Sequence, residues 1–510
     1  MKKKDEARKM SLLGNNLKNN MKERSLELLE KYFGFSDFRK GQWEVVEHIL
    51  RGKNAIAVFP TGGGKSLCYQ LPALMMPGTT IVISPLISLM KDQVDALLDK
   101  GIAASFISSS ISDHEVQRRL QEMKRGMYKI VYIAPERFQS EAFTETLKDI
   151  HIPFLAVDEA HCISQWGHNF RPSYLRIKDF IRSVGNPVVA AFTATANEKV
   201  QKDMITLLGL TECRLFVGSF DRPNLEFRIE DPDSPDAFVL NYARRHPDWL
   251  GIVYASTRRN VENLFYYLTN NGIRAGMYHA GLTAEQRNRQ QDSFLSEGIQ
   301  VMAATNAFGM GIDKSNVRFI IHYNMPISME SYYQEAGRAG RDGKKAVCIL
   351  IRNPEDYQLN KFLISSNYPP VKAAENLFHR IGRRRKTGIP VEKLLNRRSP
   401  GASVRDSALK KIIEYGYAEI RSGLVFPTEK KHFTLSQKEI DRHKHIELEK
   451  LDTMQRYTDE KVCLRAYILR YFNEEPPEER CGNCSLCYQS AVEDDKGMMD
   501  MLLSQIMGRK

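Results

Sequence analysis

The stretch AIAVFPTGGGKS, which runs from Ala55 to Ser66, decides the fold of this 510-residue chain. Its apolar start predicts a buried strand, its three glycines a turn, and Lys65-Ser66 the opening of a helix. Glycine reaches positive φ without a Cβ clash, so the N–H groups of such a turn can surround a phosphate chain. The helix N-terminus adds partial positive charge. We therefore predict a phosphate-binding P-loop; the alternative is an ordinary glycine turn that caps a helix.

Each residue of the loop has an expected role. Lys65 would reach the β- and γ-phosphates of a nucleotide, and the Ser66 hydroxyl would hold Mg²⁺. The residues expected to contact the nucleotide are Thr61, Gly62, Gly63, Gly64, Lys65 and Ser66. The chain departs from the strict P-loop pattern at Phe59, where the pattern has glycine.

Composition indicates a globular protein with an anionic partner. The hydrophobic fraction is 42%, and the net charge of +12 favours a polyanionic partner. The sequence contains no run of about 18 apolar residues, so we predict no membrane span. The basic N-terminus lacks the apolar core of a secretory signal, which favours a cytoplasmic location. Four of the eight cysteines are scattered and are expected to be reduced thiols, whereas the other four cluster near the C-terminus.

Four more apolar runs alternate with helical patterns downstream of the P-loop, which predicts a doubly wound parallel sheet. These expected strands cover residues 80–83, 130–133, 154–157 and 188–192. Ligands of such sheets bind beyond the carboxyl ends of the strands. Asp158-Glu159 follows the third of these runs, where Asp158 could hold Mg²⁺ and Glu159 could orient or deprotonate the attacking water. The alternative is a solvated turn.

An aromatic segment follows these acids. Residues 162–174 contain Trp166, His168, Phe170, Arg171 and Tyr174. Aromatic side chains stack on the bases of single-stranded nucleic acid at about 1–3 kcal/mol each. The segment could couple strand binding to hydrolysis, although a buried aromatic cluster is the alternative.

A second series of strands and helices begins near Phe216 and contains no P-loop. Residues 305–313 and 334–342, TNAFGMGID and QEAGRAGRD, follow two of its strands. Together with the P-loop, Asp158-Glu159-Ala160-His161 and Thr193-Ala194-Thr195, these motifs resemble those of superfamily 2 helicases. The block FRKGQ, residues 38–42, the aromatic segment and the cysteine cluster make the chain resemble the RecQ family of DNA helicases.

The resemblance implies a role for each matching residue. Arg39 and Gln42 would contact the adenine of ATP, and Arg341, supported by Arg338, would be the finger that reaches the γ-phosphate across a cleft. Gly311 and Asp313 would also contact the nucleotide. The expected DNA contacts are Ser84, Arg137, Trp166, His168, Phe170, Arg171, Thr305, Arg384 and Arg385. For Arg338 and Arg341 the alternative is a surface basic pair.

Residues 371–430 hold 14 Lys/Arg against 6 Asp/Glu, most of the excess positive charge. Helical patterns over 373–381, 391–395 and 407–415, followed by a predicted hairpin over 418–426, suggest a winged helix that binds duplex phosphates and wedges at a fork. A basic solvated helical insert is the alternative. RecQ proteins usually place a winged helix after the zinc cysteines, whereas this candidate precedes them. An HRDC-type C-terminal domain is expected to be absent.

Four cysteines near the C-terminus have metal-ligand spacing, with one on a predicted helix and three more within seven residues. They are Cys463, Cys481, Cys484 and Cys487. Four thiolates in a reducing compartment favour a tetrahedral, structural Zn²⁺ site. A disulfide pair is the alternative.

We therefore predict an α/β chain with two tandem RecA-like parallel-sheet lobes, a small winged-helix-like insert and a helical zinc-binding subdomain. The expected domains are a basic tail (1–20), lobe 1 (21–208), lobe 2 (209–354), the winged-helix-like region (355–445), the zinc subdomain (446–490) and a tail (491–510). The expected function is ATP-dependent unwinding of DNA in recombination, repair or replication, and the family resemblance implies 3′-to-5′ movement. We expect a monomer whose partners are single-stranded and forked DNA and single-stranded-DNA-binding protein. The alternatives are an ATP-gated DNA clamp or strand-annealing module, and an RNA helicase.

Overall fold

A computed structural model describes residues 20–167, 170–309, 314–385, 387–396, 401–421, 423–428, 430 and 432–488. The chain divides into two compact units, Met1–Ser219 and Phe220–Lys510. Across the described residues, no helix combines the length and the apolarity that a membrane crossing requires. Each unit is built on a parallel sheet, as the alternation of apolar runs and helical patterns predicts.

The first unit contains a seven-stranded parallel sheet whose first strand leads into the P-loop. All residues of four of its strands, β1 (Ala55–Val58), β2 (Thr80–Ile83), β4 (Ile130–Ile133) and β5 (Phe154–Val157), are buried, as expected where helices cover both faces of a parallel sheet. In sheet order the strands are β3 (Ala104–Ile107), β4 (Ile130–Ile133), β2 (Thr80–Ile83), β5 (Phe154–Val157), β6 (Val188–Thr193), β1 (Ala55–Val58) and β7 (Arg214–Val217).

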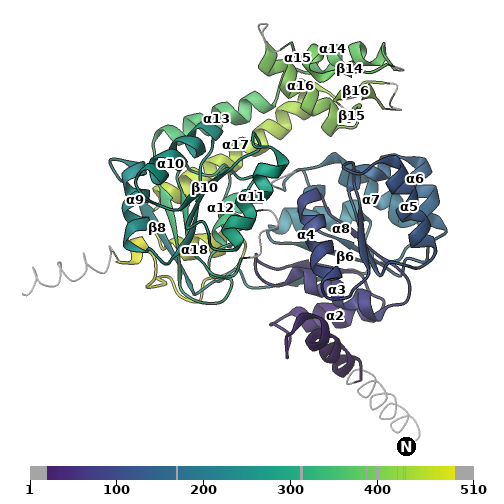
Figure 1. Cartoon of the computed structure of the whole chain (residues 1–510), viewed down its shortest axis with the longest axis horizontal. Helices are drawn as coiled ribbons and strands as arrows, with labels where there is room; N and C mark the ends of the chain where they lie inside the picture. Colours follow the sequence, from purple (N-terminus) through teal and green to yellow (C-terminus); the bar gives the residue numbers. More distant parts are fainter. Residues whose placement is uncertain are drawn as a thin grey trace, which may run out of the picture. The chain divides into compact units, whose positions relative to one another are not determined.

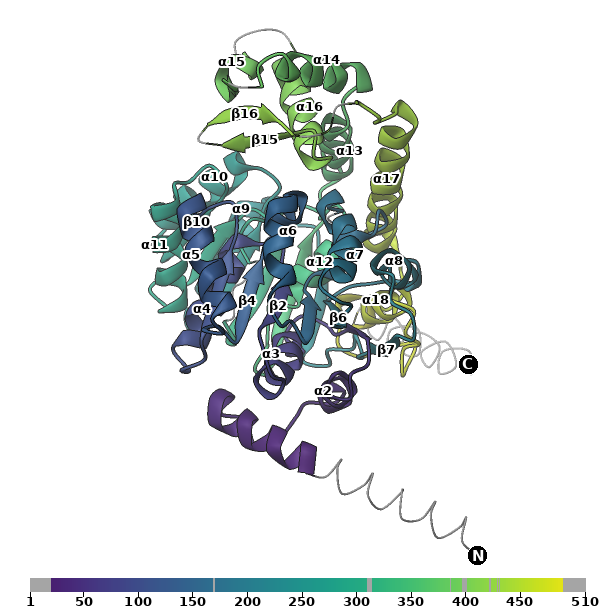
Figure 2. The ribbon, with the colours of Figure 1, turned by 90° about the vertical axis from the view of Figure 1, so that its right-hand side faces the viewer.

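Helices flank this sheet and supply the rest of its core (Figure 2). They are a helix over residues 20–33, α2 (Gln42–Leu50), α3 (Lys65–Met75), α4 (Ile87–Leu98), α5 (Asp113–Lys124), α6 (Glu141–Lys148), α7 (Ile177–Ser183) and α8 (Glu198–Leu208). Three short 3-10 helices follow strand ends or loops: η1 (Pro135–Gln139), η2 (Ala160–Ile163) and η3 (Pro172–Arg176).

The boundary between the units differs from the expected one. We expected the first lobe to end at residue 208, but β7 pairs in parallel with β1 and so completes the first sheet. The units divide after Ser219. The strand was missed because three of its four residues are exposed, so it lacks the continuous apolar run of the inner strands.

The second unit contains a six-stranded parallel sheet without a P-loop. In sheet order its strands are β10 (Ala275–Tyr278), β11 (Val301–Ala304), β9 (Leu250–Tyr254), β12 (Val317–His322), β13 (Ala346–Ile351) and β8 (Leu225–Glu230). Its flanking helices are α9 (Pro235–Arg245), α10 (Arg258–Asn270), α11 (Ala284–Leu295) and α12 (Met329–Ala336).

Two helices lead from this sheet to a small third sheet. These helices, α13 (Glu355–Asn367) and α17 (Gln437–Asp459), lie side by side (Figure 1). Between them in sequence come α14 (Val371–Gly382), β14 (Ile389–Pro390), α15 (Val391–Leu395), α16 (Ala402–Glu414), β15 (Ala418–Arg421) and β16 (Leu424–Pro427). The strands form an antiparallel sheet in the order β14-β16-β15. This order of elements is that of a winged helix. Because α17 begins at Gln437, it also crosses the boundary we expected at residue 445.

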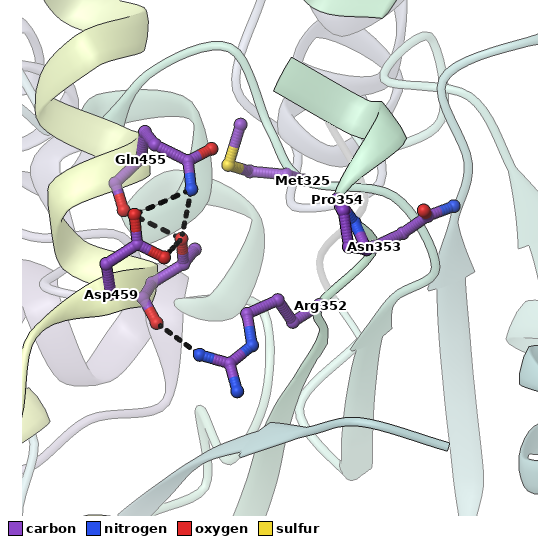
Figure 3. A pocket seen from close by; sticks show the side chains of 7 residues that line it. Met325, Arg352, Asn353, Pro354, Gln455 and Asp459 are labelled. Atoms are coloured by element: carbon purple, nitrogen blue, oxygen red, sulfur yellow. Dashed lines mark hydrogen bonds between the residues drawn. The ribbon is translucent and has the colours of Figure 1, made fainter. Parts of the chain in front are cut away.

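A cavity of about 230 Å³ marks the joint between α17 and the second sheet. It is lined by Met325, Arg352, Asn353, Pro354, Gln455, Thr458 and Asp459 (Figure 3). Its polar groups bond one another, because Gln455 Nε2 donates to Asp459 Oδ2 at 2.8 Å and Arg352 Nη1 donates to the Thr458 carbonyl at 3.4 Å. The cavity is therefore part of the anchor of α17.

Candidate active site and metal centre

The P-loop connects β1 to α3 as the sequence predicts. Gly62 and Gly64 have φ of 82° and 76°, the left-handed region that favours glycine. At Gly63 an added Cβ would lie 2.9 Å from the Pro60 carbonyl oxygen. Lys65 begins α3 and its Nζ donates to the Phe59 carbonyl at 3.1 Å. The turn is therefore preformed, with the lysine folded back over it.

The departure at Phe59 has a structural explanation. The Phe59 side chain is 4% exposed and belongs to the core of the first unit. Its backbone N–H donates to the Thr193 carbonyl at 3.0 Å, which continues the pairing of β1 with β6. The position is thus the end of a strand with an inward-facing side chain, and the glycine turn begins only after Pro60.

Arg39 and Gln42 lie against the P-loop. The Arg39 guanidinium donates to the Gly62 carbonyl. Gln42 Nε2 donates to the carbonyls of Gly63 at 3.1 Å and Gly64 at 3.3 Å, and Gln42 Oε1 accepts from the Arg39 N–H at 2.8 Å. Both side chains therefore support the backbone of the P-loop, and their contact with adenine stays a prediction.

Asp158 and Glu159 follow β5, which pairs with β6. The other neighbour of β6 is β1, the strand that leads into the P-loop. Asp158 is 7% exposed, and burial together with the Glu159 carboxylate raises its pKa to about 7, against the opposing effect of Lys65. A buried carboxylate with so little charge compensation fits a divalent cation, which would favour its ionised form. Glu159 adopts the left-handed region at φ 46°. Asp158 and Ser66 are the residues that would hold Mg²⁺.

A histidine connects these acids to the end of β6. His161 Nδ1 lies 3.3 Å from Glu159 Oε2 and 2.8 Å from Thr193 Oγ1. Thr193 Oγ1 in turn donates to the Thr195 carbonyl at 3.1 Å. The His161 side chain therefore lies between Thr193 and Glu159 and contacts both.

The aromatic segment is held by α8. Ser164 Oγ donates to Asp203 Oδ2 at 2.6 Å, and the Lys199 ammonium lies over the Trp166 ring. Trp166 is only partly buried, and so is Phe170. Tyr174, by contrast, is fully buried and donates from its hydroxyl to the Asp158 carbonyl at 2.9 Å. Tyr174 is thus part of the core, whereas Trp166 and Phe170 stay accessible; His168 lies outside the described residues.

The other expected DNA contacts of the first unit differ in exposure. Arg171 Nη1 donates to the Pro85 carbonyl at 2.9 Å, and Arg137 Nη2 donates to the Ser108 carbonyl at 2.6 Å. Arg137 lies on η1, just after β4, whereas Arg171 directly precedes η3. Ser84 is 1% exposed, so this structure does not present its side chain to a polymer.

The second unit holds the expected arginine pair. Arg338 is 6% exposed and donates to the Gly309 carbonyl, while Arg341 is partly buried. Thr305 follows β11 and its Oγ1 accepts from the Ala307 N–H at 3.4 Å. Gly311 and Asp313 lie outside the described residues. Arg338 is therefore a buried residue that holds the backbone at Gly309, and Arg341 is the more accessible of the two arginines.

The arginines of the winged helix occupy one end of α14. Arg383, Arg384 and Arg385 follow the helix and are exposed. On α16, in contrast, Lys410 pairs with Asp406 at 2.7 Å and Lys411 pairs with Glu414 at 2.8 Å. Among the described residues, the end of α14 therefore offers exposed arginines to an anion, whereas these two lysines of α16 are engaged in ion pairs.

The four clustered cysteines converge. Their sulfur atoms lie within 4.8 Å of one another, and all eight cysteines, which belong to the described part of the chain, are free thiols. This spacing and the all-thiol donor set fit tetrahedral Zn²⁺ and do not fit a disulfide pair. Cys463 caps the start of α18 (Leu464–Tyr471) instead of lying within it. The prediction of a helical position was wrong by one residue.

Several residues that shape these sites were not predicted. Lys199 and Asp203 hold the aromatic segment. Arg222 donates to the Gly340 carbonyl in the loop that contains Arg338, and Arg465, on the helix that follows Cys463, donates to the Leu225 carbonyl. None belongs to a motif that was recognised, and each lies far in sequence from the residues it contacts. Sequence spacing alone offered no signal for them.

Family profiles match three parts of the chain. They are described as DEAD/DEAH box helicase (residues 39–203), helicase conserved C-terminal domain (236–343) and RecQ zinc-binding (428–488). The ATP-dependent DNA helicase RecQ of Bacillus subtilis is 39% identical over 96% of this chain and 71% of its own length. The chain belongs to the RecQ family of ATP-dependent DNA helicases.

Other RecQ relatives match different shares of their length. The probable ATP-dependent DNA helicase RecS of Bacillus subtilis is 36% identical over 92% of this chain and 93% of its own length. RecQ of Pasteurella multocida is 42% identical, but this chain spans only 57% of that protein. The matched ranges leave out residues 344–427, which include the winged helix.

Solved structures share the fold of this RecQ-family chain. The DUF1998 helicase MrfA bound to DNA gives a TM-score of 0.56 at 19% identity, over 81% of this chain and 60% of MrfA. Dbp5 of S. cerevisiae, bound to RNA and ADP BeF3, gives 0.54 at 19% identity, over 65% of this chain and 88% of Dbp5. At this identity the likeness concerns the fold of the helicase lobes.

Proposed function

We propose that this protein hydrolyses ATP to move 3′-to-5′ along single-stranded DNA and to unwind duplex or forked DNA, in recombination, repair or replication. The observation that carries the proposal is the P-loop beside the buried Asp158, whose carboxyl lacks full charge compensation. The RecQ membership supports DNA as the polymer, and the direction of movement rests on that membership alone.

Each site residue has a proposed role in hydrolysis. The P-loop N–H groups and Lys65 bind the phosphates, and Arg39 and Gln42 hold the loop while they meet the adenine. Glu159 orients the attacking water, and its Oε2 lies 3.3 Å from His161 Nδ1. Mg²⁺, held by Ser66 and Asp158, would neutralise charge on the phosphates. Arg341 supplies the guanidinium that stabilises the charge developing on the γ-phosphate.

DNA contacts follow from the exposed aromatic and basic groups. Trp166 and Phe170 are partly exposed in the segment that follows the acids in sequence, where they can stack on bases. The three arginines after α14 supply phosphate contacts to duplex DNA, and the β15–β16 hairpin with the exposed Ile420 is the proposed wedge at the fork. We expect the enzyme to act as a cytoplasmic monomer that shares its substrate with single-stranded-DNA-binding protein.

The domain assignment that we propose uses the observed elements. Lobe 1 ends at residue 219, lobe 2 runs to residue 354, and the winged helix covers residues 371–427 between α13 and α17. The zinc subdomain comprises the C-terminal part of α17, α18 and the cysteine loop, with one Zn²⁺ held by four thiolates.

One assay series tests the function. ATP turnover and strand separation are measured with single-stranded DNA, 3′-tailed duplex, 5′-tailed duplex and RNA. We expect DNA-stimulated hydrolysis, unwinding of the 3′-tailed duplex, and loss of both in Lys65→Ala. Hydrolysis without unwinding on any DNA would favour the clamp or annealing module, stimulation by RNA would favour an RNA helicase, and equal turnover without polymer would contradict the coupling.

A further inference from the structure

The segment Phe220–Asn224 lies between the arginine pair and the cysteine cluster. On one side, the Arg222 guanidinium donates to three backbone carbonyls of one loop. Nη1 donates to Gly337 at 3.2 Å, and Nη2 donates to Ala339 at 3.0 Å and to Gly340 at 2.9 Å. Residues 337–341, here called the arginine loop, contain Arg338 and end at Arg341. One planar side chain therefore holds most of the backbone of this loop.

The local structure explains why the loop needs such a donor. Helix α12 ends at Ala336, so the carbonyls that follow have no partner further along the helix. Gly340 has φ of 55° and turns the chain toward β13. Asn224 Nδ2 also donates to the Gly340 carbonyl at 2.9 Å and to the Lys344 carbonyl at 2.9 Å. The arginine loop is thus fixed from outside, by residues that lie more than 100 positions earlier in the chain.

The other side of the same segment contacts the cysteine subdomain. Arg465 on α18 is 7% exposed, and its guanidinium donates to Asp221 Oδ1 at 2.7 Å and to the Leu225 carbonyl at 2.6 Å. Arg465 also contacts the Cys481 thiol. The Phe220 N–H donates to Glu474 Oε2 at 2.6 Å.

Aromatic packing and a strand contact strengthen this side. The rings of Phe220 and Phe472 stack with centroids 4.4 Å apart. The backbones of Cys484 and Phe227, on the edge strand β8, form an isolated parallel β-bridge. Ser485 Oγ accepts from the Ile229 N–H at 3.1 Å. The segment before β8 is therefore anchored to the residues that surround the four thiols.

We propose that Arg222 is a positioning residue for Arg341, and that the segment Phe220–Asn224 makes the placement of the arginine loop depend on the folded, metal-loaded cysteine subdomain. The proposal rests on the proposed role of Arg341 in ATP hydrolysis. A displacement of about 1 Å at a catalytic group can cost on the order of 100-fold in rate. Loss of the metal would then lower turnover through Arg341 as well as through stability.

The first experiment compares Arg222→Ala and Arg222→Lys with the wild-type protein. We expect kcat of DNA-stimulated hydrolysis to fall about 10- to 100-fold in Arg222→Ala, while KM for ATP and zinc content stay within about two-fold. Affinity for ADP with aluminium fluoride should fall in parallel with kcat, and affinity for a non-hydrolysable ATP analogue should not. Arg222→Lys should recover little, because a single ammonium group does not reproduce the planar fork.

A matched control lies on the following strand. Arg228 pairs with Glu226 at 2.5 Å and does not belong to the contacts of the arginine loop given above. Arg228→Ala should keep kcat near the wild-type value. If Arg222→Ala does not fold, Arg222→Lys keeps the charge and decides the question by the same split between kcat and KM.

A second measurement follows the dependence on the cysteine subdomain. Zinc removal from the wild-type protein with a chelator should speed amide hydrogen exchange in residues 337–341. The substitution Arg465→Gln should have the same effect. The added effect on kcat should be small in Arg222→Ala, where the connection is already cut. Unchanged exchange in residues 337–341 after zinc loss would overturn the coupling.

The two proposals fail in distinguishable ways. If Arg341→Ala keeps wild-type kcat, the proposed role of Arg341 is wrong. If Arg341→Ala lowers kcat while Arg222→Ala does not, or if Arg222→Ala raises KM and lowers kcat only as far as it unfolds, the positioning role of Arg222 is wrong and the role of Arg341 stands.

Discussion

His161 and Thr193 form a hydrogen bond of 2.8 Å in the core of the first unit, where both side chains are at most 2% exposed. Residues 158–161 and 193–195 follow different strands, and this bond connects them directly. Because His161 also lies 3.3 Å from Glu159, a change at residues 193–195 can reach the group that we assign to the attacking water.

The first prediction concerns this bond. Thr193→Val keeps the shape of the side chain and removes the hydroxyl, so we expect DNA-stimulated hydrolysis to fall by roughly 10-fold or more with little change in ATP affinity. Thr80→Val is the control, since the buried Thr80 hydroxyl has no hydrogen-bond partner among the described residues. Equal effects of the two substitutions on kcat would show that the bond has no specific role.

The second prediction concerns Trp166. Removing its ring in Trp166→Ala should preserve ATP binding and basal hydrolysis but abolish most of the stimulation by single-stranded DNA, because stacking on a base contributes about 1–3 kcal/mol. ATP binding is checked with a fluorescent nucleotide, and stimulation by titrating oligonucleotide. Tyr266→Ala removes an exposed aromatic ring on α10 and should leave stimulation unchanged. Full stimulation in Trp166→Ala would refute the role of the aromatic segment.

The third prediction concerns duplex affinity. Arg384 and Arg385 are exposed after α14, so their joint replacement by alanine should weaken duplex binding and lower the slope of log K against log salt by about 2. The control is Lys410→Ala, because Lys410 pairs with Asp406. Binding is measured by fluorescence anisotropy from 50 to 200 mM salt. An unchanged slope would place the duplex contacts elsewhere.

The fourth prediction concerns the metal. Metal analysis of the purified protein should give about one zinc per chain, as expected for a four-thiolate site. Cys481→Ser should lose the zinc and lower the thermal midpoint of unfolding, because the subdomain depends on the ion that joins its thiols. Cys213→Ser, outside the cluster, should retain both. A zinc-free wild-type protein of unchanged stability would overturn the assignment of the cysteines.

The fifth prediction concerns acid stability at the base of the winged helix. Burial lowers the pKa of His443 to about 4, and its Nδ1 lies 3.0 Å from the Tyr415 hydroxyl. In the unfolded chain the pKa is near 6.5, so below that pH the unfolded state binds the proton first and the free energy of unfolding falls as pH drops toward 4. Between pH 7.5 and 5.5 the loss attributable to His443 should be about 1 kcal/mol.

His443→Gln tests this effect because glutamine does not titrate. Denaturant unfolding at both pH values should show a smaller loss of stability in the variant than in the wild-type protein. Metal release in acid affects both proteins alike and cancels in the comparison. An equal loss in the two proteins would mean that His443 does not carry this pH dependence.

Local apolar patterns predicted the inner strands well. The expected ranges 80–83, 130–133 and 154–157 coincide with the inner strands β2, β4 and β5. The edge strands β3, β7 and β8 were missed, as was the short β14. An inner strand is buried on both faces and must be apolar throughout, whereas β7 at the sheet edge exposes three of four residues.

Helix limits set by distant contacts were also harder to predict. The expected helix over 407–415 begins at Ala402, five residues earlier. Gly401 starts it in the left-handed region, and Arg405 Nε donates to the Leu395 carbonyl at 2.8 Å, which joins α16 to α15. Such a contact depends on how two helices pack, so periodicity within one helix does not reveal it.

The sequence by itself determined the chemistry of this protein: the phosphate loop, the paired acids, the arginine pair and the four thiols are local patterns whose residue types carry their own reactivity. Only the tertiary structure decided which side chains hold those groups in place. Arg222 reaches Gly337 across 115 positions, and Arg465 reaches Asp221 across 244. A hydrogen bond over such a separation depends on the path of the whole chain, because the partners become neighbours only after the sheet and its helices have packed.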